Sequence, residues 1–223
     1  MVWWNAFPFT RRRRALILMT LRVHSCAMPT RDDAWGLVCE WTESDSLRKH
    51  MLAVEAAVRA YARRFDADEE TWAVAGLVHD LDYERHPDLE TGHPRFAVEE
   101  LRKRDYPEEV VHAVLAHADF MGVPRETLLD KALFGCDELA GFITACAYVR
   151  PEGIVGMKPK SVKKKLKQPS FAAAVNRDDV YRGAEELEPE SGLDFDQHVQ
   201  FVIDAMAEQA EELGLTGRGD ASG

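Results

Sequence analysis

Residues 72–80 read Trp72-Ala73-Val74-Ala75-Gly76-Leu77-Val78-His79-Asp80, an apolar run that ends on an imidazole and a carboxylate. The run predicts a buried helix, and burying an unpaired polar group costs roughly 2–7 kcal/mol even when that group is neutral. The helix macrodipole also disfavours a carboxylate at a helix C-terminus. A metal ion bound by His79 and Asp80 would satisfy both groups.

His79 and Asp80 can share a metal ion only where their helix ends, because consecutive helical residues point about 100° apart. The polar loop that follows, Asp82-Tyr83-Glu84-Arg85-His86-Pro87-Asp88, supplies that ending. Imidazole and carboxylate ligands without a thiolate suit one or two divalent ions, with Fe, Mn or Zn favoured and Mg as a further candidate.

Four further residues have the surroundings to complete such a site: His50, His93, His117 and Asp137. His50 shares the apolar side of its predicted helix, and Asp137 lies near the apolar stripe of another helix, where a carboxylate needs a cation. Each residue also has a plainer interpretation. His50 alone would be a core histidine, Asp137 could pair with Arg or Lys, and His93 and His117 could be caps or surface histidines.

Almost every segment has the apolar periodicity of a helix, and none shows sustained alternation of β-branched residues. We therefore predict an all-α fold, a single helical bundle with the metal site between core helices. The predicted helices are Asp32 or Asp33 to Val38, Ser44 or Ser46 to Arg64, Asp68 to Asp80, Gly92 to Arg104, Pro107 to His117, Arg125 to Val149, Phe171 to Val175, Asp178 or Asp179 to Leu187, and Asp194 to Leu213. Pro189 to Gly192 is predicted to be a loop.

Length, charge and cysteine content limit the class of protein. The 223 residues suit one domain, and the net charge of −11 argues against general nucleic-acid binding and against adhesion to an anionic membrane. The four cysteines have no Cys-x-x-Cys spacing, which indicates reduced thiols in a cytoplasmic protein. The apolar faces of the predicted helices would also allow two copies of the chain to form a homodimer.

The first 27 residues differ in composition from the rest. Four arginines, Arg11 to Arg14, precede an apolar run of seven residues, far short of the ~20 that span a bilayer. We interpret residues 1–27 as a disordered or mis-assigned extension before a start at Met28, with a signal peptide second and a membrane anchor last. Residues 28–215 are then the helical domain, with the metal core at about 45–150 and a basic C-terminal helical segment at 155–215. Residues 216–223 are predicted to be a flexible tail.

A lysine-rich segment, Lys158 to Lys167, stands out in this acidic protein. Lys163, Lys164 and Arg177 are candidate contacts for an anionic, phosphorylated small-molecule substrate, in a segment that would cover the metal site. Lys163 and its two following lysines cannot all face one site from one helix. A solvated face is the plainer interpretation of any single lysine.

The order His … His-Asp … Asp on helices resembles the HD superfamily of metal-dependent phosphohydrolases, over roughly residues 45–150. His50, His79, Asp80 and Asp137 match its four signature positions. His93 and His117 match the two extra histidines of its two-metal members. The resemblance therefore implies an HD-type helical domain in which all six residues are metal ligands.

Two sequence words resemble a bacterial and archaeal subgroup of predicted HD-domain hydrolases: Leu77-Val78-His79-Asp80-Leu81-Asp82-Tyr83 and Asp137-Glu138-Leu139-Ala140-Gly141-Phe142. The chain departs from a better-known subgroup, which has His-Asp-Ile-Gly where this chain has His-Asp-Leu-Asp. It also lacks the Gly-Tyr-Pro word of cyclic-di-GMP phosphodiesterases. Both departures argue against that activity.

The resemblance implies hydrolysis of a phosphate ester, of a nucleotide or a small phosphorylated metabolite, through a metal-activated water. Asp80 would bridge the two ions, because one carboxylate has two oxygens. Asp82 and Glu138 would complete the catalytic set by orienting the ligands, with plain solvated carboxylates as the alternative.

Two other functions remain open at this stage. Some two-iron members of the superfamily, including those that resemble myo-inositol oxygenase, use a similar His/Asp set to activate oxygen. The third candidate is a non-catalytic regulatory module with a structural metal, which would have a closed coordination sphere. Metal identity and oxygen uptake would separate the oxygenase from the hydrolase.

Overall fold

The structure is a computed structural model that describes residues 28–217. Within this range every regular element is a helix and no strand occurs, which confirms the predicted all-α fold. The predicted extension at residues 1–27 and the last part of the predicted tail, residues 218–223, lie outside the described residues. None of the described helices is long and apolar enough to cross a membrane.

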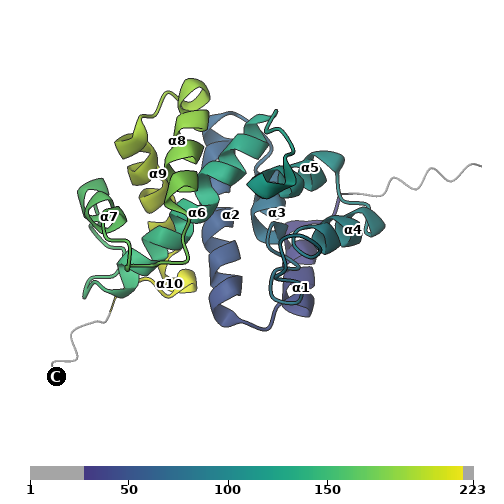
Figure 1. Cartoon of the computed structure of the whole chain (residues 1–223), viewed down its shortest axis with the longest axis horizontal. Helices are drawn as coiled ribbons and strands as arrows, with labels where there is room; N and C mark the ends of the chain where they lie inside the picture. The colour runs from purple at the N-terminus through teal and green to yellow at the C-terminus, as the bar shows by residue number, and fades with distance from the viewer. Residues whose placement is uncertain (1–27, 218–223) are drawn as a thin grey trace, which may run out of the picture.

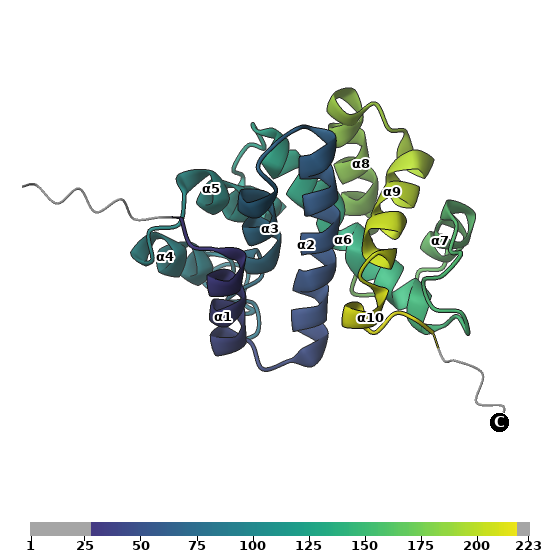
Figure 2. The same cartoon turned by 180° about the vertical axis from the view of Figure 1, so that it is seen from behind.

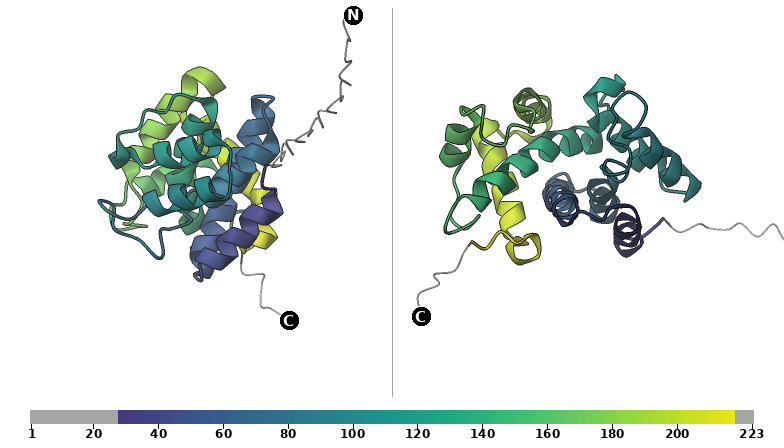
Figure 3. Two further views of the ribbon diagram at one scale, coloured as in Figure 1. Left: turned by 90° about the vertical axis from the view of Figure 1, so that its right-hand side faces the viewer. Right: turned by 60° about the horizontal axis from the view of Figure 1, so that its bottom comes forward.

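Two long helices, α2 (Asp45–Arg64) and α6 (Leu128–Tyr148), pack against each other at the centre of the molecule. In Figures 1 and 2 the helices α1, α3, α4 and α5 lie to one side of this pair, and α7 to α10 lie to the other. Helix α6 runs between the two groups (Figure 3, right). The other helices are α1 (Arg31–Trp41), α3 (Glu69–Val78), α4 (Arg95–Lys103), α5 (Glu108–His117), α7 (Pro159–Leu166), α8 (Arg177–Ser191), α9 (Phe195–Ala207) and α10 (Ala210–Leu213), with a 3-10 turn at Asp119–Met121.

Side-chain caps fix where the helices of the centre begin. The Ser44 hydroxyl accepts a hydrogen bond from the Leu47 amide at the start of α2, and the Asp68 carboxylate accepts from two amides of α3, as predicted. Thr127 caps α6 reciprocally with Asp130, three residues later than the predicted start. Thr30 caps α1 in the same way, one turn before the predicted Asp32 or Asp33.

A close contact between α2 and α3 sets the position of the His79-Asp80 pair. A Cβ atom at Gly76 would lie 2.7 Å from the Cα of Glu55, so only glycine lets the two backbones approach this far. Around this contact Val54, Val58 and Leu77 are completely buried. The contact therefore brings the C-terminal end of α3 against the side of α2 that carries His50.

Three predicted boundaries are wrong. Helix α4 begins at Arg95 rather than Gly92, because the amides of Gly92 and His93 are bonded back to carbonyls of the 86–88 loop. Helix α8 continues through Pro189, which removes one helix hydrogen bond near its last turn, and ends at Gly192 in the left-handed conformation. The predicted last helix is divided into α9 and α10 by a turn at residues 208–209.

The segment Phe171–Val175 is a series of turns and not the predicted helix. The Arg177 guanidinium donates hydrogen bonds to the carbonyls of Phe171, Ala172 and Val175. Ala172 has φ +45°, which a helix does not allow. Side-chain donors from outside the segment therefore replace the backbone hydrogen bonds that a helix would supply.

Candidate metal centre

Four of the predicted ligands converge from three helices. His50 lies on α2, His79 is the C-cap of α3 with Asp80 next to it, and Asp137 lies on α6. His50 Nε2 is 3.0 Å from Asp137 Oδ1 and 3.3 Å from His79 Nε2. His79 Nε2 is 3.4 Å from Asp137 Oδ1 and 3.5 Å from Asp80 Oδ2. The end of α3 at Val78 thus lets His79 and Asp80 face the same point.

The two remaining predicted ligands face the other oxygen of Asp80. Asp80 Oδ1 lies 3.6 Å from His93 Nε2 and 3.8 Å from His117 Nε2. Two groups of ligand atoms result, His50-His79-Asp80 and Asp80-His93-His117, and within each group all the atoms lie within 4.8 Å of one another. Asp80 is the residue that the two groups share.

The other ring nitrogen of three histidines is bonded away from the site. Nδ1 of His79 donates to the Gly76 carbonyl at 2.8 Å, and Nδ1 of His117 donates to the Val114 carbonyl at 2.6 Å. Nδ1 of His93 donates to Asp82 Oδ1 at 2.8 Å. A carbonyl or a carboxylate oxygen accepts here, so in the neutral form of each ring the proton is on Nδ1 and the lone pair of Nε2 is directed toward Asp80. This is the tautomer that a metal-bound histidine needs.

The charges of the site call for a cation. Burial alone lowers the pKa of His79, but the carboxylates of Asp80 and Asp137 outweigh burial and hold that pKa well above its ordinary value. Burial raises the pKa of Asp80, yet the imidazoles of His79, His117 and His50 hold it well below the ordinary value. Burial lowers the pKa of His117. The site therefore stabilises positive charge beside the carboxylates of Asp80 and Asp137, where the surrounding side chains present mainly lone pairs.

Divalent metal ions fit this arrangement. Imidazole nitrogens and carboxylate oxygens face one another at separations from 3.0 to 3.8 Å, and a cation among their lone pairs turns repulsion into attraction. His50, His79, Asp80 and Asp137 could hold one ion, and Asp80, His93 and His117 could hold a second. The donor set of nitrogen and carboxylate oxygen suits transition metals such as Zn, Fe or Mn.

The two predicted orienting carboxylates have different surroundings. Asp82 is completely buried, and its oxygens accept from His93 Nδ1 and from the Ala97 amide. Glu138 is partly buried and accepts a hydrogen bond from the Asn176 amide. Burial and the neighbouring Asp137 raise the pKa of Glu138 to about 8. Asp82 therefore acts on His93 directly, whereas Glu138 ties α6 to the turn before α8.

The predicted anion-binding residues are engaged elsewhere. Lys163 on α7 pairs with Asp196 of α9 at 2.6 Å. Arg177 is bonded to the carbonyls of the 168–175 segment and stacks over the Phe142 ring, 5.5 Å from its centroid. Lys164 is exposed, and no partner among the described residues is assigned to it. None of the three contacts the six histidine and aspartate side chains, and a role in substrate binding stays a prediction.

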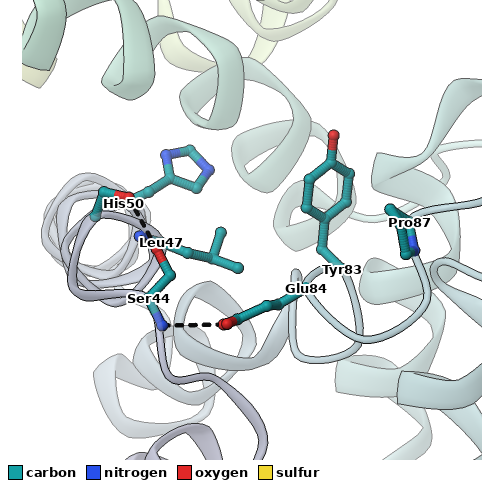
Figure 4. Close-up of a pocket in the computed structure, with 7 residues that line it drawn as sticks. Ser44, Leu47, His50, Tyr83, Glu84 and Pro87 are labelled. Atoms are coloured by element: carbon teal, nitrogen blue, oxygen red, sulfur yellow. Dashed lines mark hydrogen bonds between the residues drawn. The ribbon is translucent and has the colours of Figure 1, made fainter.

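A pocket of about 510 Å³ borders His50. Figure 4 shows its two walls: Ser44, Leu47 and His50 come from α2, and Tyr83, Glu84 and Pro87 come from the loop after Asp80. The sequence identifies this loop only as the end of α3. Its aromatic, acidic and proline residues do not by themselves predict a pocket, because the facing wall on α2 is distant in sequence.

The fold and the site together define an all-α protein with a candidate centre for divalent metal ions. Residues 47–141 match the family model of the HD domain, and all six converging histidine and aspartate residues lie within this range. Residues 47–141 are therefore an HD domain, as the sequence motifs indicate. Comparison with curated proteins and with solved structures gave no match.

Proposed function

We propose that the protein is a hydrolase that cleaves a phosphate ester of a nucleotide or another small phosphorylated metabolite, with two divalent metal ions. HD domains are generally metal-dependent hydrolases. The observation that carries the proposal is the position of Asp80, whose two oxygens face two separate sets of imidazole Nε2 atoms. One carboxylate shared in this way suits a pair of adjacent ions.

Metal ions held here would lower the pKa of a bound water and bind phosphate oxygens. The residues of the chain orient the metal ligands and bury one side of the site. His79 and His117 are fixed in the ligating tautomer by backbone carbonyls, and Asp82 fixes His93 in the same way. Apolar side chains, including Val78 and Leu81, bury the back of the site. The pocket that borders His50 offers a phosphate ester a side from which to approach.

Phosphate release tests this proposal. Full-length protein loaded separately with Mn²⁺, Zn²⁺ or Fe²⁺ is assayed against nucleoside monophosphates, sugar phosphates and glycerol 3-phosphate. We expect release by the wild type, loss to background for Asp80→Asn, and unchanged release for Glu99→Gln, an exposed carboxylate on α4. Equal release by wild type and Asp80→Asn, or none with any metal, would overturn the proposal. Oxygen uptake by the iron form without phosphate release would instead favour the oxygenase.

A further inference from the structure

The pocket beside His50 is placed to receive the part of a substrate that leaves after phosphate cleavage. His50 belongs both to this pocket and to the candidate ligand group His50-His79-Asp80. A molecule whose phosphate lies at that group would therefore extend into the pocket, between α2 and the 83–87 loop. Its volume of about 510 Å³ is within the range of small-molecule sites, roughly 300–1,000 Å³. The chemistry of its walls can therefore indicate which leaving group fits.

The walls carry no positive charge. The pocket is lined by Ser44, Ser46, Leu47, His50, Tyr83, Glu84 and Pro87, among which there is neither lysine nor arginine. The two arginines that adjoin wall residues in sequence are bonded elsewhere. Arg85 donates to the Glu40 carbonyl and lies over the Trp41 ring, and Arg48 donates to the carbonyls of Thr42 and Cys39. The single charged side chain of the walls is the carboxylate of Glu84. A second phosphate or a carboxylate of the substrate would face repulsion here.

Hydrogen-bonding groups at one edge of the pocket suit hydroxyl groups. Glu84 Oε2 accepts from the amides of Glu43 and Ser44 at 2.8 and 3.0 Å, which holds the carboxylate at the pocket edge. Glu84 Oε1 has no hydrogen-bond partner within residues 28–217. The hydroxyls of Ser44 and Ser46 lie 2.9 Å apart on the facing turn of α2. An acceptor and two hydroxyls at one edge can bind the hydroxyls of a sugar.

The remaining walls suit a planar ring. Tyr83 is 43% exposed, although it stands with its ring 5.3 Å from the buried His93 in an edge contact that fixes its position. Leu47 and Pro87 add apolar surface to the same pocket. An exposed, held aromatic ring beside apolar side chains is a stacking surface, and stacking of a base on an aromatic side chain contributes about 1–3 kcal/mol.

We propose that this pocket binds an uncharged, hydroxyl-bearing ring system, so that the substrate is a phosphate monoester of a nucleoside-like group and not a di- or triphosphate. Tyr83 stacks on the ring, Ser46 binds hydroxyls, and Glu84 binds hydroxyls and excludes further phosphates. This assignment rests on the proposed function, because it takes the ligand of the pocket to be the leaving group of the hydrolysed ester.

Binding of a nucleoside tests the pocket without metal and without catalysis. Calorimetric titration of full-length protein with adenosine in excess chelator should show binding that Tyr83→Leu weakens about tenfold. Tyr148→Leu, which removes another exposed tyrosine, from α6, should leave the affinity unchanged. An affinity that is undetectable in the wild type, or equal in wild type and Tyr83→Leu, would overturn the inference.

Kinetics separate this inference from the proposed function. With metal bound, kcat/KM should be highest for adenosine monophosphate, at least tenfold lower for the di- and triphosphates, and lower for the ring-free glycerol 3-phosphate. Glu84→Gln keeps an acceptor but removes the charge, so it should raise kcat/KM for the diphosphate relative to the monophosphate several-fold. Phosphate release with equal rates for all four substrates would overturn the inference and leave the hydrolase intact. Failure of all release, with Tyr83-dependent adenosine binding, would overturn only the hydrolase.

Discussion

Asp82 is a buried carboxylate that no Lys or Arg of residues 28–217 pairs with, and both of its oxygens accept hydrogen bonds. One accepts from His93 Nδ1 and the other from the Ala97 amide at the start of α4. Such a carboxylate orients a metal-bound imidazole and raises its basicity. Asp82 therefore connects the 82–97 segment to the second group of ligands, Asp80-His93-His117.

Asp82→Asn should weaken the binding of the second metal ion about 10–100-fold, because the amide replaces one acceptor oxygen by a donor. The first ion, held by His50, His79 and Asp137, should keep its affinity. Titration of the metal-free protein with Zn²⁺ or Mn²⁺, followed by calorimetry, measures both. Asp88→Asn, in the exposed part of the same loop, is the matched control. Two unchanged binding steps in Asp82→Asn would contradict the role given to Asp82.

The sequence predicted which six side chains meet through the order of His and Asp residues that resembles the HD superfamily. Apolar helix patterns alone left each of these residues with a plainer interpretation. The sequence was insufficient for the groups that orient them. The acceptors for His79 and His117 are backbone carbonyls of Gly76 and Val114, which no residue pattern identifies. Arg177 was predicted to contact substrate from its charge, yet backbone carbonyls of its own loop bind its guanidinium.

Helices α2 and α3 depend on each other through a single glycine. Gly76 faces the backbone of Glu55, whose buried carboxylate pairs with Arg31 of α1. The close approach places His79 within 3.3 Å of His50. The geometry of the first group of candidate ligands is therefore a consequence of how tightly these two helices pack.

Gly76→Ala should lower the free energy of unfolding by about 1–3 kcal/mol, because the added methyl group has no room. It should also weaken metal binding, since α3 must move away from α2. Urea denaturation and metal titration measure these effects. The control is Gly36→Ala in α1, where a Cβ meets nothing within 4 Å. That change should stabilise the protein by about 0.5–1 kcal/mol. Destabilisation by Gly76→Ala no greater than for Gly36→Ala would refute the argument.

Helix existence was predictable from apolar periodicity, and the starts of α2 and α3 were predictable from their Ser and Asp caps. The errors lie where tertiary contacts replace local signals. Phe171 to Val175 has helix-forming alanines, but Arg177 binds its carbonyls in a turn. Pro189 indicates a break in sequence, yet α8 continues to Ser191.

A buried hydrogen-bond chain joins α9 to the two central helices, α2 and α6. The Tyr61 hydroxyl on α2 donates to His198 Nδ1 on α9 at 2.5 Å, and His198 Nε2 donates to the Gly135 carbonyl on α6 at 3.0 Å. This assignment requires a neutral imidazole, because Nδ1 accepts. Burial lowers the pKa of His198 to about 4, which keeps the ring neutral in the folded protein.

Stability should therefore fall as the pH falls from about 6.5 to about 4. In this window the unfolded protein binds a proton at His198 and the folded protein does not, so the free energy of unfolding decreases, by up to about 3 kcal/mol for this group. Urea denaturation across that range in excess chelator, for wild type and His198→Gln, measures the contribution. The variant, which has no group to titrate here, should show a shallower decline. Parallel pH profiles for the two proteins would contradict this account.

The metal centre lies between helices of the HD-domain range, whereas α7 to α10 follow it in sequence and pack on α6 and α2. The division at residues 28–215, with a metal core at about 45–150 and a basic segment at 155–215, stays a prediction. So do the cytoplasmic location and a homodimer. What the whole structure adds is that side chains from four helices (α2, α3, α5 and α6) and from the loop before α4 converge around one shared carboxylate, Asp80.

The metal content of the purified full-length chain, measured by elemental analysis, tests the shared role of Asp80 most directly. The wild type, after loading with Mn²⁺, Zn²⁺ or Fe²⁺ and removal of free metal, should retain two equivalents per chain, and Asp80→Ala should lose both. One equivalent that survives His117→Gln would confine the centre to the first group of ligands and contradict the shared role of Asp80. No retained metal under any loading condition would contradict the central claim altogether.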